Sequence, residues 1–199
     1  MTTSAVSSRE TLTVYSIVGV LFVFILGTIF HFLFESSGRN VVLASVVPVN
    51  ESVWEHLKLL VFPFLLYMII VWLSLDGCIN NFIPGITLAI YSGSLFIVFA
   101  FYTYIGAFTR EHDLSLDILI FILGIILAFI VAYLVFVSCP VSDTLNLIAF
   151  AALLFYIFLL ILFTYSPIQI PLLQDPITGG YGIVPPLEEG AAPQFAGPP

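Results

Sequence analysis

Long apolar runs alternate with short polar connections along this chain. Successive charged residues are separated by five long gaps, at residues 11–34, 59–75, 77–109, 118–142 and 144–174. A helix needs about 17–25 apolar residues to cross a bilayer, and each gap is long enough for one such helix. The pattern therefore predicts an all-α fold, an integral membrane bundle of five transmembrane helices at residues 12–34, 57–75, 83–107, 118–138 and 145–165.

Polar residues define the ends of these spans. Residues 1–11 form an N-terminal tail, and we expect no cleavable signal, because the first apolar run exceeds the roughly 7–15 residues of a signal peptide. The third gap is trimmed to one helix by Asn80-Asn81 and Thr109, since two helices would need about forty residues. An odd number of spans puts the two termini on opposite sides of the membrane.

Two of the predicted spans carry small residues at every fourth position. This spacing makes a smooth face on which two helices can approach closely, which is the main packing device available in lipid. We therefore expect the third and fourth helices to pack against each other. The residues are Gly85, Ala89 and Gly93 in the third span and Gly124, Ala128 and Ala132 in the fourth.

The C-terminal region differs in composition from the rest of the chain. Eight of the twelve prolines lie at or after Pro167, and residues 166–183 alternate prolines with apolar residues before ending in turn-forming residues. We expect this Pro-rich stretch to be an extended segment along the cytoplasmic rim of the bundle. Residues 184–199 are predicted to be disordered.

Composition narrows the class of protein further. The 199 residues are 61% hydrophobic and 8% charged, with a mean hydropathy of +1.18, whereas a soluble domain is about a quarter charged. Four Lys and Arg against twelve Asp and Glu give a net charge of −8, which excludes a basic nucleic-acid-binding protein. The lipid bilayer is the expected environment, with another membrane protein or a second copy of the chain as the candidate partner.

The few basic residues indicate an orientation, because cytoplasmic loops carry an excess of Lys and Arg. Arg9 lies on the N-terminal side, whereas Arg39, Lys58 and Arg110 lie on the other side, in or beside the first and third connections. Three basic residues on one side against one on the other favour a non-cytoplasmic N-terminus and a cytoplasmic C-terminus for this multi-pass protein.

Ionisable residues gather where the first span ends and the second begins. His31 and Glu35 are four apart and share a helix face, and Glu51 and Glu55 are also four apart. Because the first connection is short and the two spans are antiparallel, we expect these groups to converge at one face of the membrane. The candidate site consists of His31, Glu35, Glu51, Glu55 and His56, with Asn50, Ser52 and Lys58 as supporting polar residues.

Two kinds of chemistry suit these side chains. Imidazole and carboxylate groups are ligands for a divalent metal such as zinc or iron. The same groups could form a proton relay, because ionisable groups at membrane depth are costly and commonly functional.

A structural interpretation competes with both kinds of chemistry. Asn50 is a good N-cap for the second helix, and alternatively Ser52 and Glu55 form a capping box. Glu55 can also pair with Lys58 three residues on. Capping accounts for part of the cluster and leaves the two histidines and Glu35 without an explanation.

Other candidates for chemistry are few. Cys78 and Cys139 fall in the second and fourth connections, on the predicted non-cytoplasmic side, where a disulfide between them could persist. The sequence contains no Gly-rich phosphate loop, no His-Glu-x-x-His, no Gly-x-Ser-x-Gly and no paired Cys motif. The His/Glu cluster is therefore the principal candidate site.

Four stretches of the chain together resemble a known family. They are His31-Phe-Leu-Phe-Glu-Ser-Ser-Gly38, Val49-Asn-Glu-Ser-Val-Trp-Glu-His-Leu-Lys58, Phe101-Tyr-Thr-Tyr-Ile-Gly106 and Pro171-Leu-Leu-Gln-Asp-Pro-Ile-Thr-Gly-Gly-Tyr-Gly-Ile183. In this order they are similar to an uncharacterised family of small multi-pass integral membrane proteins, a domain of unknown function. The resemblance covers most of residues 20–183, and Ser36 departs from the aromatic residue of the family pattern. It implies a membrane fold and a signature, and brings no activity, cofactor or partner.

Two classes of function follow from these observations. In the first, the His/Glu cluster is a metal or proton centre of a transporter-like protein or a membrane enzyme. In the second, the protein is a non-catalytic assembly or accessory subunit in which the cluster is structural. Spans three to five carry no ionisable residue except tyrosines and acids at their ends, which argues against a complete channel or carrier in one chain.

Overall fold

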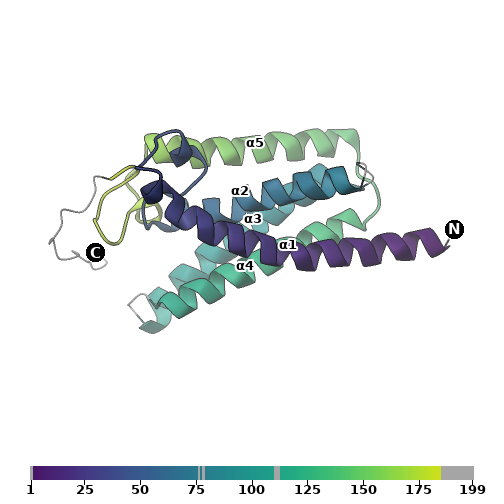
Figure 1. The fold of residues 1–199 in the computed structure, drawn as a ribbon, viewed down its shortest axis with the longest axis horizontal. Coiled ribbons are helices and arrows are strands. Elements are labelled where there is room, and N and C mark those ends of the chain that lie inside the picture. The colour runs from purple at the N-terminus through teal and green to yellow at the C-terminus, as the bar shows by residue number, and fades with distance from the viewer. Residues whose placement is uncertain (1, 76, 78, 110–112, 185–199) are drawn as a thin grey trace.

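The computed structural model describes residues 2–75, 77, 79–109 and 113–184. Within these residues the chain is an all-α bundle, and five of its helices are long and apolar enough to cross a membrane. The predicted fold class is therefore confirmed. The start of the first helix and the C-terminal part of the chain lie at opposite ends of the bundle (Figure 1). The five long helices are α1 (Thr2–Ser36), α2 (Val53–Ser74), α3 (Phe82–Tyr104), α4 (Leu114–Phe136) and α5 (Asp143–Tyr165).

Capping side chains explain why three helices begin before the apolar runs that predict them. Ser52, Asp113 and Ser142 are the N-caps of α2, α4 and α5, and each side chain accepts a hydrogen bond from a backbone N–H in the first turn. These first turns are polar, so the apolar spans start later than the helices themselves. At the N-terminus, α1 starts at Thr2 and includes most of the segment assigned to a tail.

The small-residue faces of α3 and α4 pack against each other, as predicted. A Cβ atom added to Gly93 would lie 3.0 Å from the carbonyl oxygen of Gly124, 3.1 Å from Cβ of Ala128 and 2.9 Å from a methyl group of Leu60. Ala89 and Ala128 are fully buried at this contact. The absence of a side chain at Gly93 therefore sets the distance between α3, α4 and the adjacent α2.

The approach of α1 to α2 depends on Gly27. A Cβ atom at Gly27 would lie 2.8 Å from the carbonyl oxygen of Leu59. Pro63 lies four residues after Leu59 within α2, and proline has no N–H, so this carbonyl lacks its usual helical donor. His31 follows Gly27 by one turn and shares its face, so the close approach directs His31 towards α2.

The end of the bundle that holds the end of α1 is covered by two connecting segments. The first loop (residues 37–52) includes the short helix η1 (Leu43–Ser45) and closes over a small apolar cluster. The C-terminal segment (residues 166–184) lies beside it (Figure 1) and contains the short helix η3 (Pro171–Leu173). The cluster under the first loop consists of Phe34, Ala44, Val47 and Val49.

The C-terminal segment is a series of turns after α5. Asp175 accepts hydrogen bonds from the backbone of Ile177 and from the hydroxyl of Thr178, and Gln174 pairs with Tyr181 in an isolated antiparallel bridge. Among the residues predicted to be disordered, 185–199 lie outside the described part of the chain. Cys78 lies outside it as well, so its pairing with Cys139 stays a prediction.

Substitution of Gly93 by Val tests the contact between α3 and α4. The added methyl groups meet backbone on one side, so we expect a loss of about 1–3 kcal/mol in the free energy of unfolding. Gly106→Val is the matched control, because nothing lies within 4 Å of a Cβ at Gly106. Denaturant unfolding in detergent measures both variants, and equal stabilities would contradict this account of the packing.

Candidate functional site

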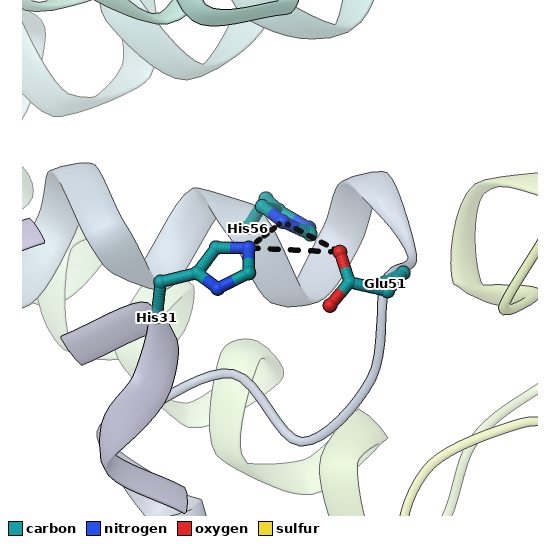
Figure 2. Close-up of side chains that lie close together, drawn as sticks. All are labelled: His31, Glu51 and His56. Atoms are coloured by element: carbon teal, nitrogen blue, oxygen red, sulfur yellow. Dashed lines mark hydrogen bonds and ion pairs between the residues drawn. The ribbon is translucent and has the colours of Figure 1, made fainter. Parts of the chain in front are cut away.

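Three side chains from different parts of the chain converge beside the first loop. His31 comes from the last part of α1, His56 from the first turns of α2, and Glu51 from the loop just before α2 (Figure 2). Nε2 of His31 lies 3.1 Å from Nε2 of His56, and Oε2 of Glu51 lies 3.6 Å and 3.4 Å from these two nitrogens. The three atoms face one another as the ligands of a single ion would.

A hydrogen bond to the N-cap residue of α2 orients the ring of His56. Its Nδ1 lies 2.9 Å from the carbonyl oxygen of Ser52, the N-cap residue of α2. A backbone carbonyl can only accept, so Nδ1 carries a proton and donates to Ser52, and Nε2 is the ring nitrogen that faces His31 and Glu51. Hydrogen bonds of this kind to the second ring nitrogen are typical of metal-binding histidines.

The ring of His31 has no such support. Its Nδ1 is buried and has no hydrogen-bond partner among the described residues. The ring of His31 is held by the contact of its Nε2 with Nε2 of His56 and by packing against the rings of Phe32 and His56, with centroids 4.9 Å and 5.0 Å away.

Glu51 supplies the negative charge of this group. Its side chain is 42% exposed, and it is the one member that lies outside a helix. The imidazole of His31, and next that of His56, hold the pKa of Glu51 well below its ordinary value, and partial burial opposes this effect. Glu51 is consequently an anion at neutral pH, the form in which a carboxylate binds a cation.

A second polar group lies deeper in the bundle, on the buried side of α2. The ammonium group of Lys58 donates to Glu55 at 2.7 Å, to the hydroxyl of Thr164 at 2.6 Å and to the carbonyl oxygen of Ala44 at 2.8 Å. Lys58 and Glu55 are 0% and 2% exposed. The other carboxylate oxygen of Glu55 accepts from Thr164 at 2.8 Å. Every proton of the ammonium group has a short acceptor, so the buried charge is fully paired.

The five candidate ligands are thus divided among three places. His31, Glu51 and His56 come together, whereas Glu55 belongs to the buried pair with Lys58. Glu35, in the last turn of α1, is exposed and pairs with Arg39, which follows the end of the helix.

The residues considered as helix caps also separate. Ser52 is the N-cap of α2, and its hydroxyl accepts from the backbone of Glu55, which is one half of a capping box. The reciprocal half is absent, because the Glu55 carboxylate turns to Lys58 and to the backbone N–H of Val49. The side-chain oxygen of Asn50 accepts the hydrogen bond from the backbone N–H of Ser52 at 2.9 Å, in place of the Glu55 carboxylate.

Thr164 is the member of the buried group that sequence reasoning missed. It lies in the last turn of α5, more than a hundred residues after Glu55, inside an otherwise apolar run. A single threonine in a membrane helix commonly bonds to its own backbone, and Thr164 also lies 3.0 Å from the carbonyl oxygen of Leu160. No local pattern distinguishes it from the other threonines of the chain.

The separations in the His31–Glu51–His56 group suit a small metal ion. Bonds of about 2.0–2.1 Å in tetrahedral directions place neighbouring ligand atoms about 3.3 Å apart. The observed separations of 3.1, 3.4 and 3.6 Å are centred on this value. Two histidines and a carboxylate would leave one position of a tetrahedral ion free for water or substrate, as in catalytic zinc sites.

Residues 4–183 match the family of unknown function DUF6512, and the chain belongs to this family. The matched region contains all five helices and both polar groups described above, apart from the first residues of α1. No curated protein and no solved structure matches the chain.

Exchanging Glu55 for Gln tests the buried pair. The substitution leaves the Lys58 ammonium group buried without a counter-ion, so we expect the free energy of unfolding to fall by about 3–5 kcal/mol. Glu35→Gln is the matched control at an exposed pair, where the expected loss is below about 1 kcal/mol. Chemical unfolding in detergent gives both values, and a tolerated Glu55→Gln exchange would show that the pair does not stabilise the fold.

Proposed function

We propose that this chain is a membrane protein that binds one divalent metal ion through His31, Glu51 and His56, and that zinc is the ion it selects. The observation that carries the proposal is the set of separations between the three ligand atoms, 3.1, 3.4 and 3.6 Å. The orientation of His56 by Ser52 supports it, because the bond fixes the tautomer that a metal requires.

Geometry favours zinc over iron at this group of ligands. Two histidines and one carboxylate also bind non-haem iron, with the three ligands on one face of an octahedron. Bonds of about 2.1 Å at right angles would bring the ligand atoms to about 3.0 Å from one another. Two of the three observed separations are several tenths of an ångström longer, which fits tetrahedral coordination better.

The open fourth position supports an enzymatic role. A zinc ion with three protein ligands binds a water molecule, lowers its pKa to near 7 and can polarise a carbonyl or phosphoryl oxygen. We infer that the chain is a membrane metalloenzyme that activates water at one face of the bilayer. Glu55 is unsuited to act on that water, because both of its oxygens accept hydrogen bonds within the buried pair.

The distribution of buried charge argues against transport of the ion across the membrane. Among the described residues, the buried acidic and basic side chains are Glu55, Lys58 and Asp175. All three lie at the end of the bundle that carries the candidate site, and a pathway for ions would need polar groups along its length. We therefore infer that the ion stays at this end of the bundle.

An accessory subunit is the second candidate function. The observation that favours it is the 3.1 Å contact between Nε2 of His31 and Nε2 of His56, which a single shared proton also explains. In that case the three side chains would join α1, the first loop and α2 without any ion.

Metal analysis of Glu51→Gln separates the two candidates. Purified wild-type protein is expected to hold about one zinc ion per chain after loading and dialysis, and Glu51→Gln to bind at least tenfold more weakly. Its free energy of unfolding is expected to fall by no more than about 1 kcal/mol, because the carboxylate is 42% exposed and water screens its interaction with the two imidazoles. Glu35→Gln is the control that keeps both zinc and stability.

His31→Ala and His56→Ala are expected to lose zinc as Glu51→Gln does. Wild-type protein that holds no zinc, cobalt or iron after loading would contradict the metal site. If His31→Ala then only lowered the unfolding temperature, the accessory role would be favoured.

We also propose that the metal site faces the cytoplasm, from the excess of basic residues at that end of the bundle. Arg9 lies near the start of α1 and Arg39 just after its end. Labelling at the two ends of α1 is therefore enough to determine which side of the membrane each end occupies. Ser36→Cys in a background without Cys78 and Cys139 is expected to resist a membrane-impermeant maleimide in intact cells. Ser4→Cys, the matched exchange at the other end, is expected to react, and the reverse pattern would invert the orientation.

A further inference from the structure

The first loop is joined to the C-terminal segment by a hydrogen bond from Arg39 to the carbonyl oxygen of Val184 and by another at Asn50, next to Glu51 in the sequence. The amide nitrogen of Asn50 donates to the carbonyl oxygen of Gly182 at 2.7 Å, across 132 residues of sequence. Asn50 is 9% exposed, so this contact is shielded from water.

The same side chain also controls the backbone around Glu51. The carbonyl oxygen of Asn50 accepts from the N–H of Ser52 at 2.9 Å, which closes a tight turn with Glu51 in its middle. Glu51 is the one metal-ligand candidate outside a helix, so no helical backbone fixes its position. The amide group of Asn50 joins this turn to the C-terminal segment.

Gly182 is a rigid partner for this contact. Its φ of +63° lies in the left-handed region, and a Cβ atom there would lie 2.7 Å from the carbonyl oxygen of Thr164. Thr164 in turn bonds to Lys58 and Glu55, so Gly182 packs against the most firmly paired part of the bundle. The C-terminal segment therefore contacts α5 at Thr164 and the loop that carries Glu51 at Asn50, so it links the positions of these two elements.

We infer that Asn50 is a positioning residue of the metal site, and that the C-terminal segment sets the place of Glu51 through it. The inference rests on the proposed metal site. A ligand on a loop binds tightly only if the loop is held in the binding conformation, and partners of ligating side chains commonly change metal affinity by about 10- to 100-fold.

Asn50→Asp is the most selective test. Aspartate keeps the oxygen that accepts from Ser52, and it replaces the donor to Gly182 by an oxygen that repels the carbonyl group. Titration of the purified full-length protein with Co²⁺, followed by the absorption of the bound ion, is expected to give about 10- to 100-fold weaker binding at an unchanged ratio of one ion per chain. Asn146→Asp is the matched control at the opposite end of the bundle, and its affinity is expected to stay that of the wild type.

Gly182→Ala tests the same bond from its other partner without altering the first loop. Its added methyl group displaces the C-terminal segment from Thr164, so we expect a similar loss of Co²⁺ affinity. The double variant is expected to lose little more than the weaker-binding single variant, because both exchanges break one hydrogen bond.

The outcomes distinguish this inference from the proposed function. If wild-type protein binds Co²⁺ and Glu51→Gln does not, while Asn50→Asp and Gly182→Ala bind like the wild type, the positioning role is overturned and the metal site stands. Additive losses in the double variant would overturn the direct link between Asn50 and Gly182. A wild-type protein that binds no Co²⁺ or Zn²⁺ overturns the proposed metal site and this inference with it.

Discussion

The three protons of the buried Lys58 ammonium group constrain the whole end of the bundle that carries the candidate site. They bond to Ala44 in the first loop, to Glu55 in α2 and to Thr164 in α5. A charge taken out of water must be paired with good geometry, or it destabilises the fold by several kcal/mol. These three segments consequently have one arrangement in which Lys58 is satisfied, and the first loop is fixed to two helices as a result.

This constraint also assigns different roles to neighbouring glutamates. Both oxygens of Glu55 are used by Lys58, Thr164 and the backbone, so this side chain cannot turn towards the histidines. The next residue, His56, is rotated about 100° around the helix and faces His31 instead. A rigid buried pair on one side of α2 thus supports a half-exposed group of potential ligands on the other side. Glu51 keeps its carboxylate available because it precedes the N-cap.

Much of the fold could be predicted from the spacing of charged residues and the small-residue faces, since both are local patterns. The Gly93 contact with α4 follows directly from the repeat of small residues in the two spans. The pairing of Glu55 with Lys58 could also be predicted, because the two residues are three apart in one helix. The rest of the division of the candidate site could not be predicted, because it depends on contacts between residues far apart in the sequence. Glu51 precedes the N-cap Ser52 and Glu55 follows it by three residues. Thr164, which donates to Glu55 and accepts from Lys58, is more than a hundred residues away and belongs to no recognisable local pattern.

Polar contacts help to place α5, because lipid offers no hydrophobic force that drives one helix onto another. α3 and α4 achieve close packing through glycine and alanine. α3 and α5 meet at two alanines, where Thr87 donates to the carbonyl oxygen of Ala149 and Tyr91 to that of Ala152, both at 3.0 Å. At its other end α5 is held by Thr164 in the Lys58 group. Hydrogen bonds therefore hold α5 near both of its ends. Because the C-terminal segment continues directly from α5, the position of α5 also determines where this segment meets the first loop.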